Sequence, residues 1–168
     1  MTLRMTPKEY QDFLAKSPKA AQALSAQAPP VTELPPKYWN VKVYVFADGT
    51  VSEDKKLTGH GKIVEKYDSR REYYRSIELG LLQRAKKISG LERQKKLLIL
   101  PEFASGEETI KAIYYLADFF YKLPDGTEVV EDVKGFDVQT GKYRSTEAFK
   151  IKWKLLKYKY RQYRFVLY

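Results

Sequence analysis

Residues 110–135 constrain the fold of this chain more than any other stretch. They contain two apolar runs, rich in β-branched and aromatic residues, on either side of Pro124-Asp125-Gly126. This order of residues is typical of a tight turn between two antiparallel strands. The stretch therefore predicts a β-hairpin around which the rest of the fold is organised.

Both predicted strands carry acidic residues among apolar neighbours. Asp118 lies in the first run, and Glu131 and Asp132 lie in the second, shortly before Lys134. Charged side chains are rarely buried without an ionic partner or a metal ion. We therefore expect the hairpin to carry the functional site.

The alternation of side chains along a strand separates these acids. Asp132 and Lys134 share one face, whereas Glu131 points to the other. Where the facing strand brings Asp118 alongside, two carboxylates and a lysine converge in an oxygen-rich site suited to Mg²⁺. The alternative is an ion pair across the strands, between Lys134 and one of the aspartates, on an exposed sheet face.

Periodic patterns around the hairpin predict the other elements. A helix begins near Ser69, which forms a capping box with Glu72, and runs to about residues 89–90. A second helix runs from Ser145 or Thr146 to Tyr158. Strands are predicted at 38–46, 63–67, 97–100 and 163–167, and polar loops or turns at 52–62, 104–108 and 136–144. This order favours an α/β fold with a mixed sheet.

The beginning of the chain differs in composition from the rest. Residues 7–16 have the spacing of a short helix, and residues 19–36 are rich in Ala, Gln, Ser and Pro, which suits an extended linker. We therefore divide the chain into a helical arm with a linker, residues 1–36, and one globular domain, residues 37–168.

The 168 residues include no cysteine, which excludes disulfides, a cysteine nucleophile and zinc sites built from thiolates. The apolar runs are all shorter than the roughly 18 residues that a membrane-spanning helix needs. We expect a soluble, cytoplasmic protein that does not bind membranes.

The net charge of +10 is concentrated at the end of the chain. Residues 138–168 contain nine Lys or Arg and a single acid, Glu147. In the second predicted helix, Phe149, Trp153, Leu156 and Tyr160 form one stripe, and several lysines lie on another. A phosphate polyanion suits such a surface, although a solvated basic face would have the same composition.

Four blocks of this sequence, taken together, resemble a known superfamily. The blocks are YDSRREYYR, IKAIYYLADFFY, VVEDVKGF and STEAFKIKWKLL. They resemble the PD-(D/E)XK nucleases, whose pattern is a helix glutamate, a strand aspartate and an acid-x-Lys on the next strand. Glu72, Asp118, Asp132 and Lys134 occupy those places in order. More narrowly, residues 37–165 are similar to small phage-borne endonucleases related to Holliday junction resolvases.

The resemblance implies a restriction-endonuclease-like core, with elements in the order αβββαβ and a mixed sheet flanked by helices. It implies a Mg²⁺-dependent endonuclease, with Mn²⁺ as a second usable metal. Asp118, Asp132 and Glu72 would bind the metal, and Lys134 would be the catalytic lysine. Contacts to DNA phosphates are assigned to four lysines: Lys150, Lys152, Lys154 and Lys157.

The biological setting implied by the resemblance is phage-type DNA recombination, replication or packaging, in the cytoplasm of the host cell. The substrate would be branched or junction DNA, and a homodimer would present two active sites to it. Two other readings of the sequence remain open. One is a basic module that binds nucleic acid without cutting it, and the other is an interaction protein whose tyrosines form its core.

Overall fold

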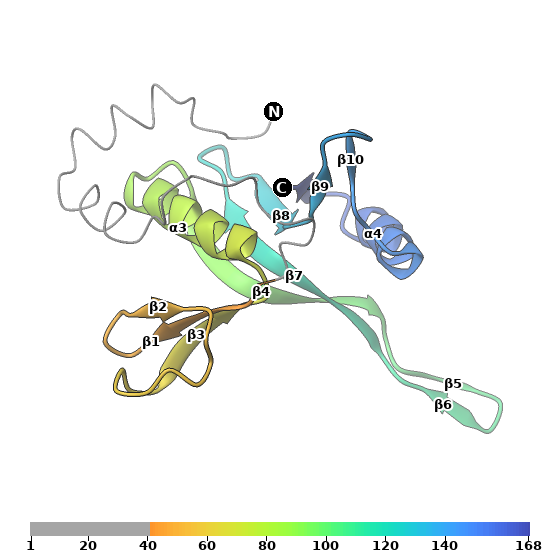
Figure 1. Cartoon of the computed structure of the whole chain (residues 1–168). Helices are drawn as coiled ribbons and strands as arrows, with labels where there is room; N and C mark the ends of the chain where they lie inside the picture. Colours follow the sequence, from red (N-terminus) through yellow and green to blue (C-terminus); the bar gives the residue numbers. More distant parts are fainter. Residues whose placement is uncertain (1–40) are drawn as a thin grey trace. The chain divides into compact units, whose positions relative to one another are not determined.

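The computed structural model describes residues 41–168, which fall into two compact units. Tyr44–Glu65 belongs to the first unit, and Lys66–Tyr168 belongs to the second (Figure 1). The predicted helix at 7–16, the linker and the boundary near Pro36 lie outside the described residues.

A small sheet, most of whose residues belong to the first unit, has the strand order β2-β1-β3. Its strands are β1 (Val43–Phe46), β2 (Val51–Ser52) and β3 (Ile63–Tyr67). The strand predicted at 63–67 is confirmed, but the predicted loop at 52–62 begins one residue later because Ser52 pairs with Tyr44. His60 lies in this loop and contacts Asp48 Oδ2 through Nδ1, at 2.7 Å.

The second unit is built on a four-stranded mixed sheet in the order β11-β8-β7-β4. β4 (Ser89–Leu100) is antiparallel to β7 (Ile113–Lys122), which is antiparallel to β8 (Glu128–Asp132). β11 (Arg164–Leu167) then runs parallel to β8. The predicted central hairpin is β7–β8, and its turn is closed by a hydrogen bond from Gly126 N to Leu123 O of 2.9 Å.

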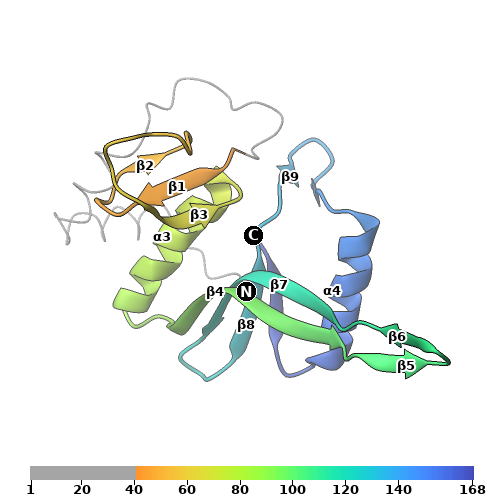
Figure 2. The same cartoon turned by 90° about the horizontal axis from the view of Figure 1, so that it is seen from below.

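Two helices cover opposite faces of this sheet, as Figure 2 shows. On one face, Arg75 of α3 (Arg70–Arg84) binds Glu131 of β8. On the other face, Trp153 of α4 (Glu147–Lys159) packs with Val130 in the main apolar cluster. Neighbouring residues of β8 therefore face different helices, as strand alternation requires. The mixed α/β class predicted from the sequence is confirmed.

The core confirms the apolar stripe predicted on the second helix. Trp153 and Leu156 are buried, and Phe149 and Tyr160 pack against the same cluster. This helix begins as predicted, because the Thr146 side chain accepts a hydrogen bond from Phe149 N.

The predicted end of the first helix, near residues 89–90, is wrong. The helix ends at Arg84, and Lys86 takes a left-handed conformation with φ 55°. Lys87 N donates to Leu82 O at 2.9 Å, and Lys86 N donates to Gln83 O at 3.0 Å. This is a Schellman end in which lysine occupies the position usually taken by glycine, so the expected stop signal is missing from the sequence.

Two predicted irregular segments form hairpins. The segment 104–108 is predicted as a loop or turn, and its centre is a turn, but its ends belong to β5 (Phe103–Ser105) and β6 (Glu108–Ile110). The segment 136–144 contains β9 (Phe136–Asp137) and β10 (Lys142–Tyr143). The strand expected at 97–100 is only the end of the twelve-residue β4.

The alternation of side chains in β7 reverses at Asp118. Tyr115 and Ala117 lie in the apolar cluster under α4, but after Asp118 it is Phe120 that joins this cluster. Gln94 of β4, with φ 52°, lies between the residues that pair with Ala117 and Phe119. Asp118 therefore lies at this irregularity: before it the odd-numbered residues of β7 point toward α4, and after it the even-numbered Phe120 does.

Candidate active site

Asp132 is the centre of the candidate site. It is the last residue of β8 and only 2% exposed. The Tyr115 hydroxyl donates to its Oδ1, and the Lys134 ammonium contacts its Oδ2. Burial and the neighbouring Asp132 charge raise the pKa of Tyr115 well above its usual value, so that this phenol stays protonated and acts as a donor.

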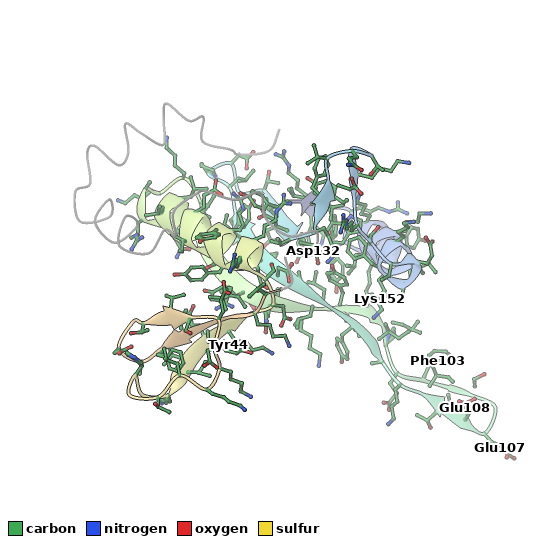
Figure 3. All side chains as sticks on the ribbon, in the orientation of Figure 1. Tyr44, Phe103, Glu107, Glu108, Asp132 and Lys152 are labelled. Atoms are coloured by element: carbon green, nitrogen blue, oxygen red, sulfur yellow. The ribbon has the colours of Figure 1, made fainter. Side chains whose placement is uncertain are left out.

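Lys134 follows the end of β8 and is held by the last strand. Its N–H donates to Tyr168 O at 3.0 Å, and Tyr168 N donates to Asp132 O at 3.0 Å, so the parallel pairing continues past β8. The Lys134 ammonium also lies 4.6 Å from the centre of the Phe149 ring. The site therefore adjoins the first turn of α4. Figure 3 labels Asp132 of β8 and Lys152 of α4.

Asp118 lies next to the Asp132–Lys134 segment. Its Oδ2 accepts a hydrogen bond of 2.7 Å from Val133 N. Burial and the charges of Asp132 and Glu72 raise the pKa of Asp118 to about 7, against the opposing effects of the Val133 N–H and Lys134. Burial is therefore the main cause of the raised pKa, and the neighbouring carboxylates add to it.

Glu72 approaches the cluster from the first turn of α3. Ser69 Oγ accepts a hydrogen bond of 3.1 Å from Glu72 N, which is the serine half of the predicted capping box. The Glu72 side chain reaches one residue farther back than predicted, because its Oε2 accepts a hydrogen bond of 2.9 Å from Asp68 N. Within residues 41–168, Oε1 has no hydrogen-bond partner, and an Arg93 nitrogen is 3.9 Å from it. Burial, with a contribution from Asp132, raises the pKa of Glu72.

Glu131 lies on the opposite face, as the alternation predicts. Its two carboxylate oxygens accept hydrogen bonds from Arg75 Nε at 2.5 Å and Arg75 Nη2 at 2.8 Å, and the Tyr121 hydroxyl donates to Oε2 at 2.8 Å. The sequence predicted the face of Glu131 but gave it no partner. Glu131 takes no part in the Asp132–Lys134 contact, but it anchors β8 to α3.

The described carboxylates suit a divalent cation in type and charge. Asp118, Asp132 and Glu72 supply hard oxygen donors, and one Glu72 oxygen is buried without a hydrogen bond. The raised pKa of Asp118 indicates that an added positive charge would be favourable there. As the side chains stand in the described part of the chain, no group of three or more acidic, histidine or cysteine side chains is close enough to bind a metal ion.

The four lysines predicted to contact DNA lie on two flanks of α4. Lys150, Lys154 and Lys157 are exposed and follow one another at helical spacing along one flank, whereas Lys152 is half-buried and lies on the other. Lys150 also pairs with Glu147 at 2.5 Å. The four lysines therefore all lie on α4, but they do not form a single stripe.

Sequence reasoning missed Tyr115, Arg75 and Arg93 as residues around the site. Tyr115 could not be assigned to the Asp132 face because the alternation of side chains in β7 reverses at Asp118, between Tyr115 and the part of β7 that pairs with β8. Arg75 did leave a signal, since it lies one helical turn after Glu72 in a segment of buried residues. A buried arginine needs an acidic partner, and Glu131 was the acid that the site did not use.

The model of a family described as "Protein of unknown function (DUF1064)" matches residues 53–167. No curated protein matches this chain. In the described residues, every helix is too short or too polar to cross a membrane.

Proposed function

Because the chain belongs to the DUF1064 family, whose description assigns no function, we propose a function from the candidate site itself. The protein is a Mg²⁺-dependent DNA endonuclease of the PD-(D/E)XK type that hydrolyses phosphodiester bonds, with a preference for branched or junction DNA. The observation that carries this proposal is the convergence of Asp118 and Asp132 beside Lys134, with the buried Glu72 close enough to raise the pKa of Asp118.

The order of elements in the second unit supports the proposal. The chain runs through α3, β4, β7, β8, α4 and β11, with small hairpins inserted between them. The nuclease resemblance implies the order αβββαβ, a glutamate on the first helix and acids on the second and third strands. Glu72, Asp118 and Asp132 lie on α3, β7 and β8.

Asp118, Asp132 and Glu72 would hold the metal ion. When bound, Mg²⁺ would supply charge to polarise the phosphate and to make a nearby water more acidic, and Mn²⁺ can supply the same chemistry. In the described structure, Tyr115 and Lys134 already hold the two oxygens of Asp132. They therefore orient this carboxylate before any ligand binds.

Lys134 has the second chemical role. Its ammonium is partly exposed beside Asp132, where it can approach a phosphate oxygen and stabilise the negative charge that develops during hydrolysis. The start of α4 adjoins this position, so Lys150, Lys152 and Lys154 are the proposed contacts to the DNA backbone.

The direct test incubates the full chain with a four-way junction, a linear duplex and a single strand, first with Mg²⁺ and then with a chelator. We expect cleavage only with the metal, and fastest on the junction. Binding of all three substrates without metal-dependent cleavage would contradict the proposal.

That outcome would favour a second function, a nucleic-acid-binding module without catalysis. The exposed lysines of α4 and the 71% exposed Tyr158 favour it, because phosphate contacts and base stacking need no metal.

A further inference from the structure

The hairpin β5–β6 forms an arm that extends beyond the four-stranded sheet, as Figure 1 shows. Ser105 pairs with Glu108 across a two-residue turn, in which Gly106 has the left-handed conformation with φ 60°. All three residues of β5 are exposed. A two-stranded ribbon without packing is marginally stable in water, so the arm has the character of a docking element.

The chemistry of the arm indicates its partner. Three glutamates and one lysine lie in residues 101–112, in a chain whose net charge is +10. Phe103 is 43% exposed beside these acids. An acidic surface is repelled by DNA phosphates, so the arm suits a basic protein surface with an apolar centre.

The end of α4 is a surface of that kind on the same chain. Leu155 is 45% exposed and Tyr158 71% exposed, and their spacing places them on one face of the helix. The Arg161 guanidinium is 4.8 Å from the centre of the Tyr158 ring, and the exposed Lys157 precedes Tyr158 on the adjoining flank of the helix. This face therefore offers positive charge around exposed apolar groups.

We propose that the arm of one copy docks on the end of α4 of a second copy, and that the second copy returns the same contact. Phe103 would pack against Leu155 and Tyr158, and Glu107 and Glu108 would pair with Lys157 and Arg161. Within one chain, the tip that carries Glu107 points away from α4 (Figure 3). Two arms paired with each other would bring like charges together, so the reciprocal contact of arm with helix is the complementary one.

This contact divides α4 between two partners. Lys157, in the last turn of α4, and Arg161, just after the helix, bind the arm. Lys157 was predicted to contact DNA, so this inference takes it from that set and leaves Lys150, Lys152 and Lys154 for the DNA backbone. The inference does not rest on nuclease activity, because its measured quantity is the mass of the protein in solution.

The test uses two variants of the full chain whose charges are reversed on opposite sides of the contact. One is Glu107→Lys/Glu108→Lys, and the other is Lys157→Glu/Arg161→Glu. In sedimentation across a range of concentrations, the wild type should reach twice the 19.6 kDa of one chain. Each variant alone should dimerise at least tenfold more weakly, because its arm and helix carry like charges.

Mixing the two variants should restore the dimer, since both contacts of the mixed pair are again between opposite charges. The matched control is Glu53→Lys/Glu65→Lys, which makes the same change of charge at exposed positions of the first unit and should dimerise like the wild type. A wild type that stays monomeric, variants that dimerise normally, or a mixture that does not recover would each overturn the proposal. Variants that change only DNA binding would do so as well.

Discussion

Arg75 of α3 and Glu131 of β8 form a buried ion pair in which two guanidinium nitrogens meet two carboxylate oxygens, at 2.5 and 2.8 Å. Arg75 also contacts Glu78 at 2.7 Å and stacks on the ring of Tyr168, 4.1 Å from its centre. One turn before Arg75 lies Glu72, and one residue after Glu131 lies Asp132. The pair therefore fixes the two elements that bring these acids to the candidate site.

Removing one partner of this pair should destabilise the fold strongly. Glu131→Ala leaves the buried Arg75 with Glu78 as its remaining acidic partner, so we expect the free energy of unfolding to fall by about 3 kcal/mol, the lower end of the range for a broken buried pair. Chemical denaturation measures this change. The control is Glu128→Ala on the same strand, which removes a partly exposed pair with Lys122 of 3.0 Å and should cost about 1 kcal/mol or less. Equal effects of the two variants would show that the buried pair anchors nothing.

The raised pKa of Asp118 predicts a pH dependence of stability. Between the ordinary value of 3.8 and about 7, the folded state binds a proton that the unfolded state has lost. The free energy of unfolding should therefore fall as the pH rises through this window, by at most about 1.4 kcal/mol per pH unit from this group. Melting temperatures at pH 5 and pH 8 measure the effect, and Asp118→Asn should reduce the difference.

Metal binding should act on the same group in the opposite direction. A bound cation favours the charged carboxylate, so Mg²⁺ should raise the melting temperature more at pH 8 than at pH 5. Removing the metal with a chelator should reverse the rise. An equal shift at both pH values, or the same shift in Asp118→Asn, would place the metal elsewhere.

The proposed DNA contacts can be counted from the salt dependence of binding. Lys150→Ala/Lys154→Ala should weaken binding to every DNA substrate and reduce the slope of log K against log salt by about 2. Lys55→Ala/Lys56→Ala, in an exposed loop of the first unit, is the control and should leave the slope close to that of the wild type. If both pairs change the slope equally, α4 has no special part in binding DNA.

Local signals explain what could be predicted from the sequence. The β7–β8 turn and the second helix were found because Gly126 and Thr146 act within a few residues of their own positions. The faces of Glu131 and Asp132 were assigned correctly because β8 is a regular strand. The turn, the helix start and the faces of β8 are each determined by residues within the same segment.

The missed features depend on distant or irregular contacts. Tyr115 contacts Asp132 only because the side chains of β7 change faces at Asp118, opposite the left-handed Gln94. The sequence does not show this change, because glutamine and not glycine has the left-handed conformation there. Arg75 and Glu131 are 56 positions apart. The sequence shows both charges but not the packing of α3 on the sheet that pairs them.

The most direct measurement is the rate at which an excess of protein cleaves a labelled four-way junction in Mg²⁺, compared between the wild type and Asp132→Asn. Our account predicts cleavage by the wild type and a rate lower by roughly 10²-fold or more in the variant, because the variant loses a carboxylate charge at the centre of the site. DNA binding and the melting temperature, measured on the same samples, should stay close to those of the wild type. Equal cleavage by both proteins, or none by the folded wild type, would contradict the account.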